Sequence, residues 1–160
     1  MERAIADAVK REYPGAEMLM GTATAGIAHA AIAASLLGLP MGYVRSGAKD
    51  HGRQNRIEGS MAPGTAVVII EDLISTGGSV VETAEALREA GANVLGAVSI
   101  FTYNMKKGAD RLREAGLKNV SLTDFDTVAA TAARDGYISP DDVRRLLRFR
   151  DDPSDESWIG

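Results

Sequence analysis

Cysteine is absent from this chain of 160 residues. Its absence excludes disulfide bonds, zinc sites built from thiolates and a cysteine nucleophile, and it fits a reducing compartment. Aromatic residues make up only 5% of the sequence, which argues against a surface that stacks nucleic-acid bases. No apolar run approaches the roughly 18 residues that cross a bilayer, and Met1–Lys10 lacks the apolar centre of a secretory signal. We therefore expect a cytoplasmic protein that does not engage a membrane.

Basic residues are outnumbered by acidic ones, 18 to 22, which gives a net charge of −4. This balance argues against binding to nucleic acid, which relies on basic patches. The hydrophobic share of 45% and the charged share of 25% are typical of a soluble globular domain. A chain of this length can bury a core without disulfides or metals. We expect one domain over residues 1–150 and an acidic C-terminal tail over residues 151–160, with Asp151–Glu156 forming a loose segment.

Two kinds of segment alternate along the chain. Apolar runs rich in valine and isoleucine predict strands at residues 17–20, 41–45, 65–70, 93–101 and 120–122. Alanine- and leucine-rich stretches of helical spacing predict helices at residues 2–13, 27–37, 79–90, 106–115, 125–134 and 141–149. This alternation predicts an α/β fold with a central, mostly parallel sheet flanked by helices. Ligands of such sheets bind beyond the carboxyl ends of the strands, here the loops after Met20, Arg45, Ile70 and Phe101.

The most informative stretch is Glu71-Asp-Leu-Ile-Ser-Thr-Gly-Gly-Ser79, which follows the most apolar predicted strand. Its two glycines have no Cβ, so backbone N–H groups can approach an anion closely. Its serine and threonine hydroxyls are further donors, and the helix that follows contributes unpaired N–H groups and the positive end of its dipole. The stretch therefore predicts a cradle for a phosphate group.

Glu71 and Asp72 would repel a phosphate in that cradle, so they need another partner. A pair of ribose hydroxyls suits a carboxylate acceptor, and a nearby Mg²⁺ ion is the alternative. A simpler interpretation is that the stretch is only a capped turn. Ser79 would then be the N-cap of the helix, and Glu82 would complete a capping box.

A second segment, Ser46–Ser60, is polar, rich in glycine and without the periodicity of a core element. It carries Lys49 and His51, together with two arginines. Its composition suits a lid over a substrate with an anionic leaving group, to which lysine offers a charge and histidine a hydrogen bond or a proton. The alternative is an ordinary solvated surface loop. His29, on the predicted helix 27–37, is expected to be a surface or packing residue.

The stretch at residues 71–79 resembles the phosphoribosyl pyrophosphate (PRPP) signature of the type I phosphoribosyltransferases. Over nearly the whole chain, to about residue 149, the sequence is similar to the orotate phosphoribosyltransferase branch of that family. The rival phosphate motifs GxxxxGK[ST] and GxGxxG are absent. The motifs that carry the resemblance occur in the expected order: Gly21-Thr-Ala-Thr-Ala-Gly-Ile27, Tyr43-Val-Arg-Ser46, Lys49-Asp-His-Gly52, Ile57-Glu-Gly59 and Glu71–Ser79.

The resemblance implies roles for individual residues. Lys49, His51 and Asp72 are expected to be catalytic, and Ser75 to lie near the orotate. Tyr103 stands where some relatives have an arginine that contacts orotate. The turn at residues 21–26 resembles the loop that binds pyrophosphate through backbone N–H groups. The residues expected to bind PRPP are Arg45, Lys49, His51, Glu71, Asp72, Leu73, Ile74, Ser75, Thr76, Gly77, Gly78 and Ser79.

The resemblance also implies the reaction and its partners. We expect transfer of ribose 5-phosphate from PRPP to orotate, with Mg²⁺ as cofactor held mainly by PRPP and no metal site built by the protein. A homodimer is expected, in which the basic loop reaches the neighbouring subunit's site. Relatives carry a further amino-terminal segment that forms part of a hood over the base, and Met1–Tyr13 matches the helix after it. The hood is therefore expected to be largely missing. The alternatives are a transferase for another nucleobase, a non-catalytic PRPP-binding regulatory module or an inactive fragment.

Overall fold

The computed structural model describes residues 1–45, 47 and 56–159. Its described strands form one sheet in the order β3-β2-β1-β4-β5-β6. All neighbouring strands are parallel except β2 and β3, which are antiparallel. The predicted α/β fold with a mostly parallel sheet is confirmed. The strands are β1 (Met18–Thr22), β2 (Met41–Val44), β3 (Ile57–Glu58), β4 (Ala66–Ile74), β5 (Asn93–Thr102) and β6 (Asn119–Asp124).

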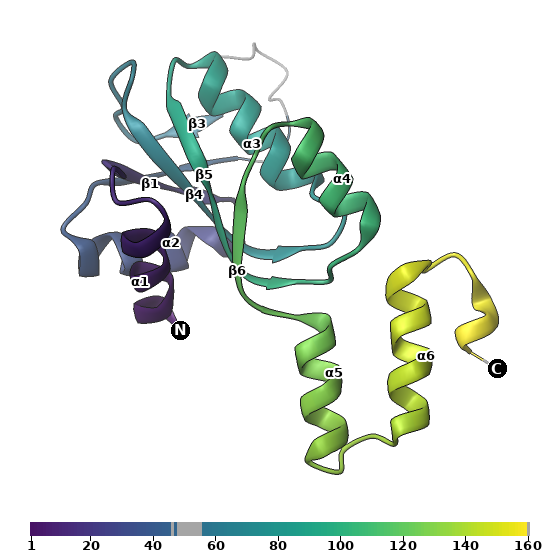
Figure 1. The fold of residues 1–160 in the computed structure, drawn as a ribbon. Coiled ribbons are helices and arrows are strands. Elements are labelled where there is room, and N and C mark those ends of the chain that lie inside the picture. Colours follow the sequence, from purple (N-terminus) through teal and green to yellow (C-terminus); the bar gives the residue numbers. More distant parts are fainter. Residues whose placement is uncertain (46, 48–55, 160) are drawn as a thin grey trace.

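Helices cover both faces of the sheet (Figure 1). On one face lie α1 (Glu2–Glu12) and α2 (Ala25–Leu37), which bury small and branched side chains against β1, β4 and β5. On the other face lie α3 (Gly78–Glu89) and α4 (Lys106–Glu114). Because both faces are covered, the central strand has to be apolar on both sides. Residues 67–70 of β4 are accordingly fully buried.

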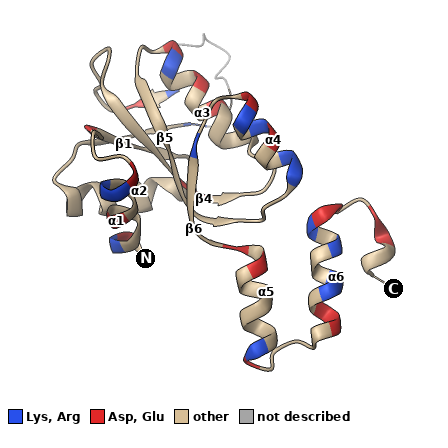
Figure 2. Cartoon of the chain, in the orientation of Figure 1, with Lys and Arg blue, Asp and Glu red and all other residues tan. Residues whose placement is uncertain are grey.

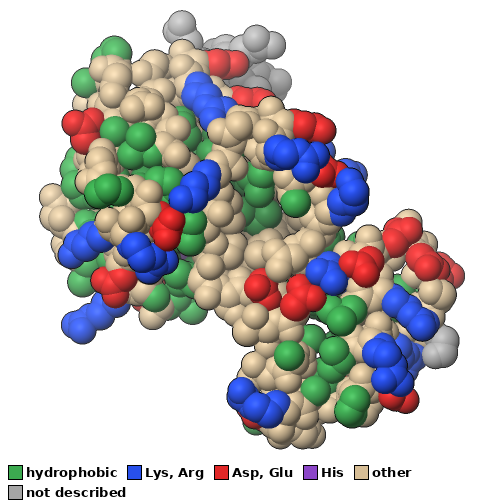
Figure 3. All heavy atoms as spheres, viewed as in Figure 1, with side chains coloured by type: hydrophobic (Ala, Val, Ile, Leu, Met, Phe, Trp, Pro, Cys, Tyr) green, Lys and Arg blue, Asp and Glu red, His purple; other side chains and the backbone are tan. Residues whose placement is uncertain are grey.

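Beyond the sheet, α5 (Phe125–Arg134) and α6 (Pro140–Asp151) form a hairpin that stands away from the sheet (Figures 1 and 3). Asp124 caps α5 through a hydrogen bond from the Thr127 N–H, and Ser139 caps α6 in a capping box with Asp142. Charged side chains are mixed along α6, whereas α5 carries them only near its ends (Figure 2). The uncharged middle of α5 leaves apolar side chains that can pack against α6.

Three expectations about elements need correction. Strand β4 continues through Ile74 instead of ending at Ile70, because Glu71, Leu73 and Ile74 stay paired with β5. The short strand β3 lies within the segment expected to have no core element, and it pairs with the end of β2. The third correction concerns the C-terminal tail.

The tail after α6 is not loose. Its 3-10 turn η2 (Glu156–Trp158) folds back onto α6, where the guanidinium of Arg145 donates hydrogen bonds to the carbonyls of Trp158 and Ile159. The Trp158 ring also meets the Phe149 ring edge to face, with 5.2 Å between the centroids. An acidic composition predicted solvation, but the apolar and aromatic residues of the segment find a partner in α6. Among the described helices, none has the length and apolar character needed to span a membrane.

Candidate functional site

The loops that follow β1 and β4 come together at one edge of the sheet. Gly26 lies so close to β4 that a Cβ there would sit 2.5 Å from the carbonyl oxygen of Ile70. A Cβ on Gly21 would likewise sit 2.9 Å from the carbonyl oxygen of Gly26. These glycines bring the β1–α2 turn directly against the strand that delivers Glu71 and Asp72. The sequence predicted that these two loops share one site, and the structure brings them together.

The turn from Ser75 to Gly77 joins the end of β4 to the start of α3. Gly77 is the N-cap of α3 and adopts a left-handed backbone with φ of 72°, which favours glycine. No side chain in the described chain caps this helix end. The first N–H groups of α3 are thus left for an external acceptor, as in a helix N-terminus that binds an anion.

The alternative of an ordinary capped turn is wrong in its details. Ser79 is inside the first turn of α3 rather than at its N-cap, and its hydroxyl donates to Glu71 Oε2 at 3.0 Å. Glu82 does not close a capping box. Its carboxylate faces the guanidinium of Arg56, at 3.7 Å.

Glu71 is buried, with 4% of its surface exposed. One carboxyl oxygen accepts the Ser79 hydroxyl and the other accepts the Asp72 N–H at 3.1 Å. Burial raises the pKa of Glu71 to about 7, and the neighbouring Asp72 side chain adds to the rise. Both oxygens of Glu71 therefore work within the turn, where they connect the end of β4 to the start of α3.

Asp72 is the more accessible of the two acids, since its side chain is half-buried whereas that of Glu71 is buried. The next residues differ as well. Leu73 is 39% exposed, whereas the side chain of Ile74 is buried in the core beside α3. Any contact of Ile74 with a ligand would have to come from its backbone. Ser75 and Thr76 are half-buried at the turn itself.

Arg45 directly follows β2, at the same edge of the sheet as the ends of β1 and β4. Its Nε lies 3.3 Å from Glu58 Oε1. Its backbone is fixed by Arg56, whose carbonyl accepts the Arg45 N–H and whose Nε donates to the Arg45 carbonyl. Arg56 also reaches Glu82 on α3, so it links this edge to the helix that follows the Ser75–Gly77 turn. Lys49 and His51, both predicted from the sequence, lie outside the described residues.

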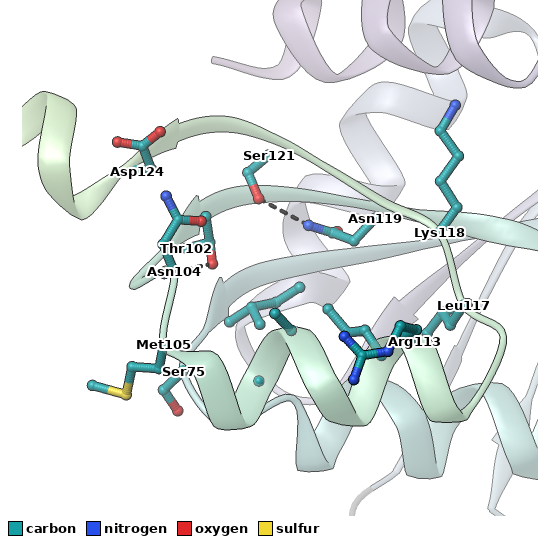
Figure 4. A pocket seen from close by; sticks show the side chains of 14 residues that line it. Ser75, Thr102, Asn104, Met105, Arg113, Leu117, Lys118, Asn119, Ser121 and Asp124 are labelled. Atoms are coloured by element: carbon teal, nitrogen blue, oxygen red, sulfur yellow. Dashed lines mark hydrogen bonds between the residues drawn. The ribbon is translucent and has the colours of Figure 1, made fainter. Parts of the chain in front are cut away.

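A cavity of about 510 Å³ lies beside the turn, between α4 and the strands β5 and β6. Thr102, Asn104 and Asp124 lie at one end of it, near Ser75, and Lys118 lies toward the other (Figure 4). The sequence predicted that the loop after β5 borders the site but singled out neither Asn104 nor Asp124. The sequence did offer a signal, because Asn104 and Asp124 are polar residues at the ends of the adjacent strands β5 and β6.

His29 lies on α2, outside the turns at this edge of the sheet. His29 bridges α2 to α1 through a contact of 3.1 Å between its Nδ1 and Glu2 Oε1, which confirms it as a surface and packing residue. Across the described residues, no group of three or more histidine or carboxylate side chains is arranged to hold a metal ion. Asp72 offers a half-buried carboxylate beside the Ser75–Gly77 turn, and such a group could hold a Mg²⁺ ion that takes most of its oxygens from a phosphorylated ligand.

Comparisons with known proteins agree with this geometry. Residues 2–132 match the family model described as "Phosphoribosyl transferase domain". A curated relative from Halalkalibacterium halodurans, called orotate phosphoribosyltransferase, is 51% identical over 151 residues, which cover 94% of this chain and 72% of the relative.

Solved structures give the same picture. The orotate phosphoribosyltransferase of Aeropyrum pernix superposes with a TM-score of 0.74 at 27% identity, covering 86% of this chain and 75% of that one. An adenine phosphoribosyltransferase from Thermoanaerobacter pseudethanolicus superposes with a TM-score of 0.62 at 20% identity, covering 78% of this chain and 77% of that one, and shows the shared fold alone. The chain thus belongs to the phosphoribosyl transferase family and, within it, to the orotate phosphoribosyltransferases.

Proposed function

We propose that this chain transfers the ribose 5-phosphate of PRPP to a ring nitrogen of orotate, giving orotidine 5′-monophosphate and pyrophosphate. The bond between the anomeric carbon and the pyrophosphate oxygen breaks, the bond to the orotate nitrogen forms, and that nitrogen loses its proton. The observation that carries the proposal is the uncapped start of α3 next to the accessible Asp72. Such an arrangement would serve as a phosphate seat with a ribose acceptor beside it.

The 5′-phosphate would bind at the turn formed by Ser75–Gly78 and the first turn of α3. The backbone N–H groups at the uncapped start of α3 would point at the ligand, and the positive end of the helix dipole favours the negative charge of the phosphate. Thr76 adds a hydroxyl group, and Ser79 would add a second if its hydroxyl turned from Glu71 to the phosphate. Leu73 and Ile74 would contribute to PRPP binding through the backbone that leads into the turn.

The ribose hydroxyls would donate to Asp72, which is half-exposed at the end of β4. A charge-assisted hydrogen bond of this kind is stronger than a neutral one. Glu71 was predicted to share this role, and its buried carboxyl instead supports Asp72 and the turn in the absence of ligand. Asp72 is therefore the acid that we assign to direct ribose contact.

The leaving pyrophosphate gains negative charge as the bond breaks, so positive groups lower the barrier. We assign this role to Lys49 and His51 on the strength of the resemblance, and to Arg45 on its position after β2. Mg²⁺, bound mainly through PRPP, would supply further charge stabilisation. The β1–α2 turn, held against β4 by Gly26, would face the pyrophosphate with its backbone.

Orotate would bind near Ser75, at the β4 end of the turn that would seat the phosphate. The end of the cavity formed by Thr102, Asn104 and Asp124 lies there, with an uncharged hydroxyl, an uncharged amide and one carboxylate as donors and acceptors for the polar edge of a pyrimidine. The pKa of Asp124 is lowered because its carboxylate accepts the Thr127 N–H, so this group stays an acceptor.

An assay with each base tests the proposal. The purified chain, PRPP and Mg²⁺ are mixed with orotate, adenine, hypoxanthine or uracil, and nucleotide formation is followed by chromatography. We expect turnover with orotate above all others. Turnover with a purine alone, or PRPP binding without any turnover, would contradict the proposal and favour another transferase or a regulatory PRPP-binding module.

We further propose a homodimer in which Lys49 and His51 serve the neighbouring subunit's site. Mixing Lys49→Ala with Asp72→Asn protein, at a PRPP concentration well below the wild-type KM so that each variant alone is strongly impaired, would form hybrid dimers with one intact site. Recovery of up to about a quarter of the wild-type activity is expected when subunits exchange at random, because half of the dimers are hybrids with one working site in two. No recovery after verified subunit exchange would show that the loop acts on its own subunit.

A further inference from the structure

A row of aromatic rings connects the sheet to the C-terminal hairpin. The Tyr103 ring lies between Phe101 and Phe125, with centroid distances of 5.1 and 5.5 Å. Phe125 in turn meets Phe149 at 6.3 Å, and Phe149 meets Trp158 at 5.2 Å. These distances are within the range in which aromatic pairs attract. In a chain with only three Phe, four Tyr and one Trp, most of the aromatic side chains are used in this one row.

The Phe101 and Tyr103 rings belong to the segment next to the Ser75–Gly77 turn. The Tyr103 N–H donates to the carbonyl of Ile74 at 2.9 Å, directly before Ser75. Five residues later, Gly108 lies so close that a Cβ there would sit 2.4 Å from the Ser75 carbonyl oxygen. Residues 103–108 therefore hold the backbone of Ser75 on two sides.

Polar contacts also connect this segment to the hairpin. Asn104 has a left-handed backbone with φ of 55°, which is uncommon for a residue other than glycine. Its N–H donates to Thr102 Oγ1 at 3.1 Å and its side-chain amide to Asp126 Oδ2 at 3.4 Å. The same Asp126 oxygen accepts Nη1 of Arg150 at 3.1 Å. Arg150 is on α6, and its side chain is only 20% exposed.

We propose that the hairpin of α5 and α6 is a positioning element for the base side of the active site, and that Phe149 and Arg150 act through Tyr103 and Asn104. This inference rests on the proposed function and adds to it the residues that fix the base-binding loop. Neither Phe149 nor Arg150 lies among the residues matched by the phosphoribosyl transferase domain model, which end at 132. The alignment with the Halalkalibacterium halodurans relative covers 94% of the chain and so extends into α6.

The shape of the molecule explains why this arrangement has an effect at a distance. The hairpin stands apart from the sheet as a separate lobe (Figures 1 and 3). The ring contacts of Tyr103, Phe125 and Phe149 join the two. A loop that follows a strand is held in place only by its local contacts. Here one side of the loop is bonded to Ile74 and the other to the hairpin, so a loosened hairpin leaves Asn104 held from one side only.

Amide hydrogen exchange on the substrate-free chain tests the coupling directly. Arg150→Ala and Phe149→Leu should speed exchange of the amides of residues 103–108 by about tenfold, the usual scale of coupling along such contacts. Exchange in β1 and β4 should stay as in the wild type. Arg148→Ala, an exposed arginine on the same helix, is the matched control and should change nothing. Unchanged exchange at residues 103–108 in both variants would overturn the proposal.

Trp158, the only tryptophan, reports whether the hairpin is still folded in each variant. Its emission is recorded without orotate, so that the base does not absorb the exciting light. Arg150→Ala should keep the wild-type emission maximum. If Phe149→Leu unfolds the hairpin and residues 103–108 still exchange slowly, the loop does not depend on the hairpin and the proposal fails.

Kinetics then separate a positioning role from general support of the fold. For Arg150→Ala we expect the KM for orotate to rise about tenfold while the KM for PRPP changes less than about twofold. Equal rises in both KM values would overturn the assignment to the base side. Absence of orotate turnover in the wild type would refute the proposed function instead, and the exchange experiment would still decide the coupling.

Discussion

The two sides of the candidate site are built in different ways. The phosphate side consists of the β4–α3 turn, and the hydrogen bonds that join Glu71 to Asp72 and Ser79 fall within nine consecutive residues. The base side consists of the loop between β5 and α4, and its contacts reach residues 126, 149 and 150 of the C-terminal hairpin. One side is closed by neighbours in sequence and the other by partners that are distant along the chain.

This difference has a consequence for specificity. A phosphate seat made of backbone N–H groups and a helix end recognises charge and shape, which every phosphoribosyl donor shares. Proteins with this fold can carry names for different bases, as the adenine phosphoribosyltransferase from Thermoanaerobacter pseudethanolicus illustrates. A loop held by side chains from a separate hairpin can change with the base while the phosphate seat stays the same. Substitutions on the two sides should therefore affect different kinetic parameters.

The largest effect is expected for Lys49→Ala, a change that concerns the leaving pyrophosphate and lies outside the β4–α3 turn. Loss of one charge that stabilises the leaving group should lower kcat by about 10² or more. The KM for orotate should change little, because the lysine is assigned to pyrophosphate. Steady-state kinetics with both substrates varied will measure the effect, and turnover near the wild-type level would refute the assignment of Lys49.

Gly108→Ala should be the next most harmful change, because it acts where the two sides touch. The new Cβ would meet the carbonyl oxygen of Ser75, a backbone atom that cannot move away cheaply. We expect a loss of about 1–3 kcal/mol in the free energy of unfolding, measured by urea denaturation, together with a higher KM for orotate. Gly15→Ala is the matched control, since no atom lies within 4 Å of the corresponding position. Equal stabilities of the two variants would show that the contact with Ser75 is not tight.

Asp72→Asn tests the phosphate side without disturbing its backbone. The amide keeps the size of the side chain but removes the negative charge that accepts from the ribose hydroxyls. The KM for PRPP should rise about tenfold, the scale of a lost charged hydrogen bond, while the circular dichroism spectrum and the KM for orotate stay close to those of the wild type. PRPP kinetics identical to those of the wild type would exclude the ribose role.

Glu71→Gln should have the smallest effect on turnover, and its effect on the free energy of unfolding should depend on pH. Burial raises the pKa of Glu71 from 4.5 to about 7, so the folded state binds the proton more tightly than the unfolded chain does. The stability supplied by this protonation is complete below pH 4.5 and is lost as the pH rises through about 7.

The glutamine resembles the protonated acid and does not titrate. The variant and the wild type should therefore be nearly equal in stability at low pH, and the variant should be more stable by about 1–3 kcal/mol at pH 8. Urea denaturation at both pH values measures the difference. A difference that does not change with pH would show that Glu71 does not titrate in this range.

Much of the phosphate side could be predicted from the sequence, because its geometry is local. Glycines at 77 and 78, hydroxyl residues around them and an apolar strand before them fix the turn. The extent of β4 was harder to predict. Two adjacent acids read as the start of a loop, yet β4 continues past them because Ser79 and the Asp72 N–H satisfy the buried carboxyl of Glu71.

The base side was only partly predictable, for a different physical reason. The loop after Phe101 was expected to border the site, but nothing near it in the sequence points to Asp126 or Arg150. The pairing of these residues depends on how the hairpin turns back toward β5, which is decided by ring contacts between distant residues. In the same way, an acidic composition hid the return of Trp158 to Phe149.

The sequence by itself determined the alternation of strands and helices, the order of the motifs and the chemistry of the phosphate turn, since each depends on periodicity or on adjacent residues. Only the tertiary structure decided that Glu71 faces inward while Asp72 remains accessible, that Gly26 and Gly108 press against the backbone of β4 and Ser75, and that the hairpin reaches Asn104. Those outcomes depend on which surfaces meet when the chain collapses, and contacts between residues far apart in the chain leave no periodic trace in it.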